Sequence, residues 1–474
     1  MTGSAAVVVA SNRGPVSYAL DDDGRLTARR GGGGLISGLS AVGEAVWVCA
    51  ALTEGDRRAA REAGGRLGLI EDSSTAVRML TIDTTTFLRA YNGVANSTLW
   101  FVHHLLFDTP SVPLFDERWE REWAAYVDYN AAFADALAEE AAPGGRVLVQ
   151  DYHLTLAPAM LRFRRPDLRI GHFSHTPWAP PEYFRVLPDD VATAVLEGVL
   201  GADTAGFLTE RWAEAFLDCC ADVLGAQVDR EDRTVTHRGR TTRIGVHPLG
   251  VDGAELRDRA AQPDVQSRVA TLREQVDGRL AIVRVDRTEL SKNIVRGLEA
   301  YRLLLRRYPT WLGRVVHVAF AYPSRHDLPV YREYTAAVQR VAHEIDDEFG
   351  TPGWQPLLLH VQDDLPRSLA AYCLADVLLV NPLRDGMNLV AKEGPVLSER
   401  GCALVLSREA GAAEELGRDA LLVNPFDLVE TADALHRALS MTQEQRREVS
   451  DRLAAAATAL PPQQWLAAQL DDLA

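Results

Sequence analysis

Short runs of Val, Ile and Leu alternate with longer amphipathic segments along almost the whole chain, and this alternation restricts the fold most. The runs are continuously apolar, which is typical of parallel strands covered on both faces. The longer segments have helical periodicity, most clearly residues 116–140. The sequence therefore predicts an α/β fold with parallel sheets between layers of helices. Strands are expected at residues 5–10, 47–51, 146–149, 168–173, 204–207, 280–285, 315–319, 357–359, 377–380, 403–406 and 421–423.

Two breaks divide the 474 residues. Residues 247–253, His-Pro-Leu-Gly-Val-Asp-Gly, have the composition of a turn between domains. A second break at Leu460-Pro461-Pro462 isolates a short helix at residues 463–473. At roughly 150 residues per domain, the length suits two large domains or three smaller ones. We expect an N-terminal domain over residues 1–247, a C-terminal domain over 248–460 and a final helical segment over 461–474.

Composition excludes several classes of protein. The 50 basic and 66 acidic side chains give a net charge of −16, so a nucleic-acid partner is not expected. No apolar run reaches the roughly 18–20 residues that span a bilayer, and the N-terminus lacks the features of a signal peptide. The five cysteines form no CxxC pair, which favours the reducing cytoplasm and argues against disulfides or a structural zinc.

Two N-terminal segments have the chemistry of anion-binding loops. Four consecutive glycines, which include Gly33 and Gly34, let a backbone approach a ligand and turn its amides toward an anion. Their spacing fits neither a dinucleotide fingerprint nor a Walker A loop, so a nicotinamide oxidoreductase is disfavoured; an ordinary surface loop is the alternative. Arg13 follows the first predicted strand, where its guanidinium suits a phosphate.

Asp151 and His175 also follow predicted strands. The carboxylate of Asp151 is a candidate site residue because it follows a strand. The alternative is that it caps the next helix. His172 and His175 have no third ligand at a metal-binding spacing. We therefore expect hydrogen-bonding roles for these two histidines rather than a zinc site.

The second half of the chain carries two further phosphate-binding candidates. Arg287 and Lys292 lie between a strand and a helix, where they could neutralise a diphosphate; helix capping by Ser291 is the alternative. Residues 381–393 again join a strand to a helix, and Asp385 and Glu393 could accept hydrogen bonds from sugar and ribose hydroxyls. Four amides at this helix start could hold phosphate oxygens: those of Gly386, Met387, Asn388 and Leu389.

In this order, the motifs resemble the trehalose-6-phosphate synthase family, retaining glycosyltransferases of family 20 that use a nucleotide-glucose and glucose 6-phosphate. The match covers nearly the whole chain and is almost verbatim at residues 382–393. The resemblance implies a GT-B fold, in which two facing Rossmann-like domains flank a central cleft. It assigns the acceptor to the N-terminal domain and the nucleotide sugar to the C-terminal domain. It also implies that the final helix returns to the N-terminal domain.

The same resemblance implies the site residues. Reaction-centre roles fall to Asp151, His175, Arg287, Lys292 and Asp385. The acceptor sugar phosphate would be held by Arg13, Trp47, Tyr91, Trp100, Asp151 and Arg325. The donor would be held by Gly33, Gly34, Arg287, Lys292, Asp385, Gly386, Met387, Asn388, Leu389 and Glu393. No metal or other cofactor is required, because two cations and a helix N-terminus can neutralise the diphosphate.

Three segments depart from the family's usual residues. Gln150 replaces a His, residues 175–179 read His-Thr-Pro-Trp-Ala for His-Ile-Pro-Phe-Pro, and residues 287–293 read Arg-Thr-Glu-Leu-Ser-Lys-Asn for Arg-Leu-Asp-Tyr-Ser-Lys-Gly. The last form resembles pseudo-glycosyltransferases of the validoxylamine-phosphate type, which couple a GDP-cyclitol. The sequence therefore favours GDP-glucose slightly over UDP-glucose. Such a pseudo-enzyme and a non-catalytic sugar-phosphate sensor are the alternatives, and a homo-oligomer is compatible with each.

Overall fold

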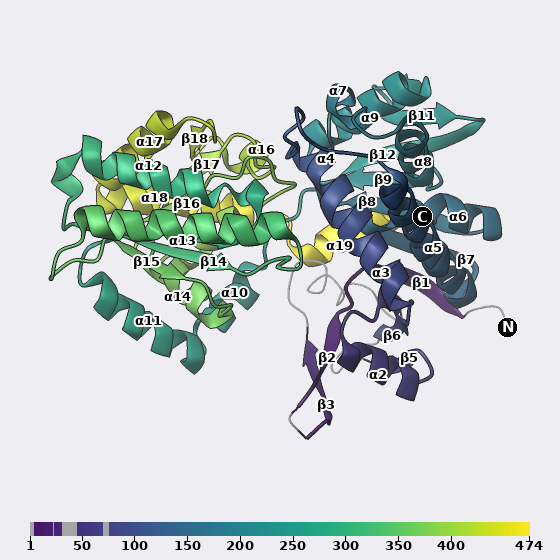
Figure 1. Cartoon of the computed structure of the whole chain (residues 1–474), viewed down its shortest axis with the longest axis horizontal. Helices are drawn as coiled ribbons and strands as arrows, with labels where there is room; N and C mark the ends of the chain where they lie inside the picture. Colours follow the sequence, from purple (N-terminus) through teal and green to yellow (C-terminus); the bar gives the residue numbers. More distant parts are fainter. Residues whose placement is uncertain (1–3, 22, 31–44, 70–74) are drawn as a thin grey trace. The chain divides into compact units, whose positions relative to one another are not determined.

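The computed structural model describes residues 4–21, 23–30, 45–69 and 75–474 (Figure 1). Contacts divide the chain into two compact units. The first unit is Met1–Leu249 together with Pro462–Ala474, and the second unit is Gly250–Pro461. Each unit has an α/β architecture around a mainly parallel sheet, as the apolar runs predicted.

The first unit contains a sheet of order β10-β11-β12-β9-β8-β7-β1-β4-β6-β5. From β12 to β6 all neighbours are parallel, and both edges are antiparallel. The parallel strands are β1 (Ala5–Ala10), β4 (Ala45–Ala50), β6 (Thr75–Leu80), β7 (Ala141–Gln150), β8 (Arg169–Ser174), β9 (Thr204–Phe207) and β12 (Arg240–Val246). The edge strands are β5 (Arg66–Leu69), β10 (Gln227–Asp229) and β11 (Thr234–His237).

A separate hairpin of β2 (Val16–Leu20) and β3 (Leu26–Arg30) follows β1 and was not predicted from the sequence. It is fastened to α2 (Glu54–Glu62) through Asp56, whose carboxylate accepts the Tyr18 amide at 2.7 Å. Gly55 permits this approach, because a Cβ there would lie 2.1 Å from the Tyr18 carbonyl oxygen.

The helix predicted at residues 116–140 is α5 (Glu117–Glu140). It begins where the Asp116 side chain accepts the Trp119 amide at 3.0 Å. The first unit's other helices are α3 (Thr84–Leu88), the π-helix η2 (Arg89–Leu99), α4 (Trp100–His104), η3 (Tyr152–Leu154), α6 (Ala157–Arg164), α7 (Pro181–Phe184), α8 (Asp189–Val199) and α9 (Glu210–Leu224).

The last helix, α19 (Pro462–Asp471), returns to the first unit and lies against its sheet (Figure 1, yellow). Trp465 and Leu466 are buried there. Glycines on two strands leave room for the returning segment. A Cβ on Gly171 would lie 3.3 Å from Leu473, and one on Gly245 would lie 3.0 Å from the Asp472 carboxylate.

The second unit contains a six-stranded parallel sheet of order β15-β14-β13-β16-β17-β18. Its strands are β13 (Leu280–Arg287), β14 (Val315–Tyr322), β15 (Leu357–His360), β16 (Val377–Val380), β17 (Ala403–Ser407) and β18 (Leu421–Val423). Its helices are α10 (Gly253–Ala260), α11 (Pro263–Val276), η4 (Leu290–Lys292), α12 (Ile294–Arg307), η5 (Pro309–Trp311), α13 (Pro329–Phe349), α14 (Leu365–Leu374), α15 (Val390–Leu397), α16 (Ala413–Leu416), α17 (Leu428–Ser440) and α18 (Gln443–Ala457).

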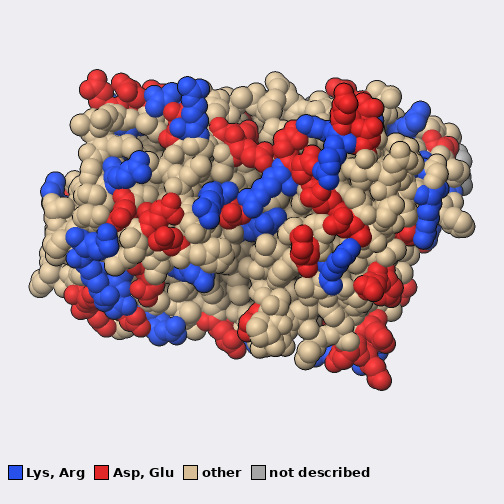
Figure 2. Space-filling model, turned by 90° about the horizontal axis from the view of Figure 1, so that it is seen from above, with Lys and Arg blue, Asp and Glu red and all other residues tan. Residues whose placement is uncertain are grey.

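Charged side chains of both signs lie on the surface, and the cysteines lie in the interior. On the face drawn in Figure 2, acidic and basic side chains are interspersed. All five cysteines are buried free thiols. Within the described ranges, no helix is both long and apolar enough to cross a membrane.

Candidate active site

The strand order of the first unit places two predicted site residues at neighbouring strand ends. Numbered along the chain, its parallel strands run 3-2-1-4-5-6-7, so the order reverses between β1 and β7. Open α/β sheets bind ligands beyond the carboxyl ends of the strands at such a reversal. Arg13 lies three residues after β1 and is exposed, and Asp151 directly follows β7.

Trp47 supports the segment that carries Arg13. Its indole N–H donates to the Ser11 hydroxyl at 2.8 Å, and that hydroxyl donates to the Arg13 carbonyl at 2.6 Å. Only 1% of Trp47 is exposed. The indole therefore lies beneath the strand end and holds its backbone, and its predicted role in acceptor binding stays a prediction.

Asp151 adopts a left-handed backbone with φ 75°, which is unusual for a residue other than glycine and is found at functional sites. Its amide donates to the Phe173 carbonyl at 2.7 Å, and its Oδ1 accepts the His175 amide at 3.2 Å. Its Oδ2 lies 3.8 Å from Nδ1 of His153. The carboxylate is thus held between the ends of β7 and β8, beside His175.

The imidazole of His175 is hydrogen-bonded to a side-chain amide. Its Nε2 lies 2.8 Å from Oε1 of Gln150, the residue that departs from the family's usual His. Burial lowers the pKa of His175, although the Asp151 carboxylate opposes this effect. His175 is therefore neutral at physiological pH.

The π-helix η2 and the following helix α4 each bring one predicted aromatic residue to the loop after β7. Tyr91 stacks on His153 with ring centroids 5.6 Å apart and an interplanar angle of 15°. Trp100 stacks on His104 at 3.8 Å and lies 5.6 Å from the Tyr152 ring. Tyr91 and Trp100 therefore contact the two residues that follow Asp151. Gly33 and Gly34 lie outside the described residues.

The second unit has the strand order 3-2-1-4-5-6, which reverses between β13 and β16. Arg287 ends β13, and the loop after β16 carries Asp385. Lys292 joins these two strand ends, because its Nζ lies 2.6 Å from Oδ2 of Asp385. The predicted diphosphate and sugar residues of this unit therefore meet at its switch point.

The Lys292–Asp385 pair is mostly buried, with side chains 16% and 14% exposed. Burial alone would lower the pKa of Lys292, but Asp385, Asp286 and Glu289 raise it above its ordinary value. Lys292 is therefore a permanent cation. Asn388 also donates to Oδ2 of Asp385, at 3.0 Å.

Glu289 organises the cations of this site, and sequence reasoning noted it only as a departure from the family's usual Asp. Its side chain is fully buried, and its Oε1 accepts the Ser324 hydroxyl at 2.9 Å. Burial alone would raise the pKa of Glu289, but three cations and this hydroxyl lower it to about 2. The cations are Arg287, Arg325 and Lys292.

Arg287 is the exposed member of this group. Its Nε lies 3.4 Å from Oε1 of Glu289, while 58% of its side chain is exposed. Arg325, with φ 50°, donates to the Tyr331 hydroxyl at 2.8 Å. Arg325 thus lies in the second unit beside Glu289, although the sequence assigned it to the acceptor and the acceptor to the N-terminal domain.

The loop before α15 is fastened to the segment before α16. The carbonyl of Asp385 accepts the Gly411 amide at 3.1 Å, and that of Met387 accepts the Ala412 amide at 2.8 Å. Asn388 has φ 77°, and its Oδ1 accepts the Ala391 amide at 3.2 Å. The predicted donor-binding amides of Gly386, Met387, Asn388 and Leu389 therefore belong to one braced turn at a helix start.

Glu393 lies in the first turn of α15, a short distance beyond this loop. Burial raises the pKa of Glu393, while a hydrogen bond from Tyr372 opposes the effect. Such a carboxylate has an acceptor oxygen for a ligand hydroxyl near the switch point. Its predicted contact with ribose stays a prediction.

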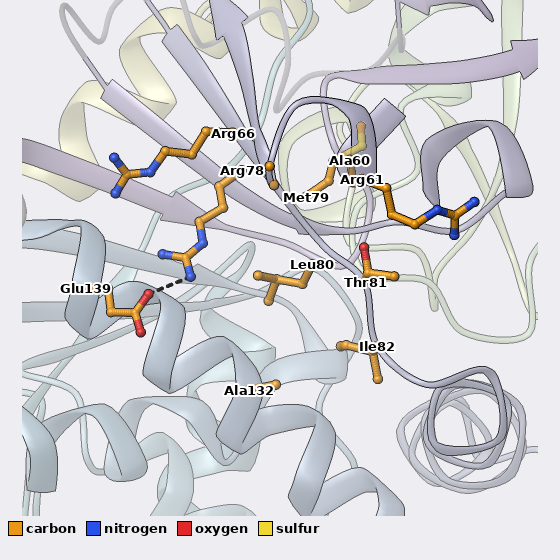
Figure 3. Close-up of a pocket in the computed structure, with 12 residues that line it drawn as sticks. Ala60, Arg61, Arg66, Arg78, Met79, Leu80, Thr81, Ile82, Ala132 and Glu139 are labelled. Atoms are coloured by element: carbon orange, nitrogen blue, oxygen red, sulfur yellow. Dashed lines mark hydrogen bonds and ion pairs between the residues drawn. The ribbon is translucent and has the colours of Figure 1, made fainter. Parts of the chain in front are cut away.

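A cavity of about 470 Å³ lies elsewhere in the first unit and contains none of the predicted site residues (Figure 3). Of the arginines that line it, Arg78 is paired with Glu139 at 2.6 Å and with Glu140 at 2.8 Å, and Arg66 is also paired with Glu140. The third arginine of the lining, Arg61, lies 2.8 Å from Glu54, so each of the three has a carboxylate partner. Across the described part of the chain, no three His, Cys, Asp or Glu side chains group as metal ligands.

The family model described as Glycosyltransferase family 20 matches residues 5–474. The chain belongs to glycosyltransferase family 20. It is 34% identical over 469 residues to the alpha,alpha-trehalose-phosphate synthase (UDP-forming) of Schizosaccharomyces pombe, covering 96% of this chain and 88% of the relative. It is also 34% identical over 458 residues to synthase (UDP-forming) 2 of Aspergillus fumigatus, with 95% and 93% covered.

A solved structure described as trehalose-6-phosphate from E. coli bound with UDP-2-fluoro glucose has a TM-score of 0.87 and 29% identity. The alignment covers 98% of each chain. The predictions of a GT-B fold and of a glycosyltransferase are therefore confirmed. The substrate-binding role of each residue stays a prediction.

Proposed function

We propose that this glycosyltransferase moves glucose from UDP-glucose to glucose 6-phosphate with retention, giving α,α-trehalose 6-phosphate. The observation that carries the proposal is the cation group at the switch point of the second unit. There Lys292 is paired with Asp385, and the exposed guanidinium of Arg287 lies beside the buried carboxylate of Glu289. Such a group suits a leaving nucleoside diphosphate.

UDP replaces the GDP that the sequence slightly favoured. The names of the two curated relatives support UDP, and so does the nucleotide of the E. coli structure. The departure at Asn293 has a local structural reason. Its backbone is left-handed with φ 57°. Its side-chain nitrogen Nδ2 donates to the carbonyls of Asn381 at 3.0 Å and Pro425 at 2.8 Å. This side chain is 2% exposed, so it does not indicate a different nucleotide base.

The chemistry assigned to the second unit is electrostatic. As the bond from glucose C1 to the diphosphate oxygen stretches, Arg287 and Lys292 stabilise the growing negative charge. Asp385 orients Lys292 and accepts hydrogen bonds from glucose hydroxyls. The acceptor oxygen bonds to C1 on the same face, and its proton passes to the departing phosphate oxygen. This route requires neither the carboxylate pair of a glycosidase nor a metal ion.

The first unit is assigned to the acceptor. Arg13 supplies a cation for the phosphate, while Tyr91 and Trp100 supply aromatic surfaces beside the loop of Asp151. Arg325 is a further cation that we assign to the binding of a substrate phosphate. We place the enzyme in the cytoplasm, since its five thiols are free and buried.

A turnover assay tests the proposal. Glucose 6-phosphate is incubated separately with UDP-, GDP- and ADP-glucose, and both the nucleoside diphosphate and a phosphorylated non-reducing disaccharide are measured. UDP-glucose should be the fastest donor and should give equal amounts of the two products. A faster rate with GDP-glucose would overturn the choice of base. Tight binding of nucleotide-glucose without turnover would favour a cyclitol-coupling enzyme or a sensor instead.

A further inference from the structure

Two buried glutamine side chains connect His175 to the last helix of the chain. Nε2 of His175 lies 2.8 Å from Oε1 of Gln150. Nε2 of Gln150 donates to Oε1 of Gln469 at 3.2 Å, and Nε2 of Gln469 donates to the Trp465 carbonyl at 3.3 Å. Gln150 is 1% exposed and Gln469 is 4% exposed, so water does not compete for these bonds.

The last acceptor in this series, the Trp465 carbonyl, determines which atom donates and which accepts in every hydrogen bond before it. A backbone carbonyl can only accept, so Gln469 must turn its amide nitrogen toward Trp465. Its oxygen then points toward Gln150, which must donate from its side-chain nitrogen. The oxygen of Gln150 consequently points toward His175. Because this oxygen also only accepts, Nε2 of His175 must carry a hydrogen.

Turning over a single amide breaks this order. If Gln150 alone turned over, its oxygen would face the oxygen of Gln469, and its nitrogen would face Nε2 of His175. If Gln469 also turned over, its oxygen would face the Trp465 carbonyl oxygen. Each case leaves buried polar groups unsatisfied, at a cost of about 1–3 kcal/mol per group.

The rings around His175 and the end of α19 hold the series in place. The imidazole lies 5.5 Å from the Trp465 ring and 5.1 Å from the Phe173 ring. The residue after α19, Asp472, accepts from Nε2 of His247 at 2.7 Å. Trp465 in turn donates its indole N–H to the His247 carbonyl at 3.1 Å. The helix that carries Gln469 is thus fixed at both ends.

We propose that Gln150 and Gln469 are positioning residues that hold His175 in its Nε2–H form, leaving the lone pair of Nδ1 to accept a substrate hydroxyl. The identity of that hydroxyl rests on the proposed function, whereas the state of the ring does not. A Gln at position 150 has no titratable proton, so the direction of the series is independent of pH. A His in its place would exchange donor and acceptor roles as it titrates.

Nitrogen NMR of the histidine rings tests the proposal without substrate. The protein is labelled with ¹⁵N-histidine, and His175 is assigned as the signal lost in His175→Gln. We expect its Nε2 to show the shift of a protonated nitrogen and its Nδ1 that of an unprotonated nitrogen. The opposite pattern, or averaged shifts of the two nitrogens, would overturn the proposal with no variant needed.

Substitutions in α19 test whether Gln469 causes the preference of His175 for the Nε2–H form. Gln469→Met removes the acceptor for Gln150, so the two nitrogens of His175 should move toward averaged shifts. Gln464→Met changes an exposed residue of the same helix and should leave the spectrum unchanged. An unchanged His175 spectrum in folded Gln469→Met would refute the role of Gln469.

Kinetics separate this inference from the proposed function. If His175 accepts a substrate hydroxyl, Gln469→Met should lower kcat/KM by about two- to tenfold, the contribution of one hydrogen bond. Gln464→Met should keep the wild-type value. A wild-type protein with the expected NMR pattern but no disaccharide product would contradict the proposed function and leave the assignment of the ring intact.

Discussion

Replacing Glu289 with Gln removes a negative charge from a fully buried position and changes the size of the side chain little. The pKa of Glu289 is lowered from an ordinary 4.5 to about 2, because the nearby cations outweigh the cost of burial. At 1.36 kcal/mol for each pKa unit, folding stabilises the ionised form by about 3 kcal/mol more than the protonated form. Gln resembles the protonated form, so we expect Glu289→Gln to lower the free energy of unfolding of the second unit by about 3 kcal/mol at pH 7.

The effect has a defined pH dependence. The pKa of Glu289 is lower in the folded chain than in the unfolded chain, so its charge adds stability above about pH 4.5. This stability is lost as the pH falls toward 2. Wild type and Glu289→Gln should therefore differ most at neutral pH and should converge between these two values.

Urea unfolding followed by peptide-resolved hydrogen exchange measures the effect in the second unit separately from the first. Glu333→Gln is the matched control, because Glu333 is exposed on α13 and should change the free energy of unfolding by less than about 0.5 kcal/mol. A loss in Glu289→Gln below 1 kcal/mol at pH 7, or one that stays constant down to pH 3, would refute the charge-based reasoning.

Three further substitutions test other parts of the structure. Arg287→Ala should lower turnover about 10²–10³-fold because the diphosphate loses a counter-charge, and it should also lower Tm because buried Glu289 loses a cation; near-normal rates would reject its role. Arg325→Ala should mainly raise the KM for glucose 6-phosphate, and unchanged saturation would exclude it as the phosphate ligand. Gly206→Ala should cost about 1–3 kcal/mol in urea unfolding, since its Cβ would lie 2.5 Å from the Phe173 ring, whereas Gly353→Ala meets no atom within 4 Å.

Most of the buried parallel strands could be predicted from their apolar runs, whereas the parallel strands β6 and β12, which polar residues interrupt, were not predicted. The expected strands at residues 204–207, 377–380 and 421–423 coincide with β9, β16 and β18. The start of α5 could also be predicted, since Asp116 is a local capping residue. These features depend on neighbours in sequence, which is why the amino-acid pattern reveals them.

The short antiparallel strands were missed because they are only partly buried and lack such runs. One signal was present in the β11–β12 hairpin, where Arg238 and Gly239 both have positive φ in a two-residue turn. Within the site, the positions of Asp151 and Asp385 after strands were predictable. The hydrogen bond between Gln150 and Gln469 joins residues 319 positions apart, and no local pattern indicates it.

The return of α19 to the first unit has a consequence for biosynthesis. This helix emerges only after Gly250–Pro461 has been translated, a delay on the order of tens of seconds at about 5–20 residues per second. Until then, the sheet surface around Gly171 and Phe173 lacks the cover of Trp465 and Leu466. The part of the protein that is synthesised first is therefore completed last, and its partly built sheet must avoid other apolar partners in the meantime.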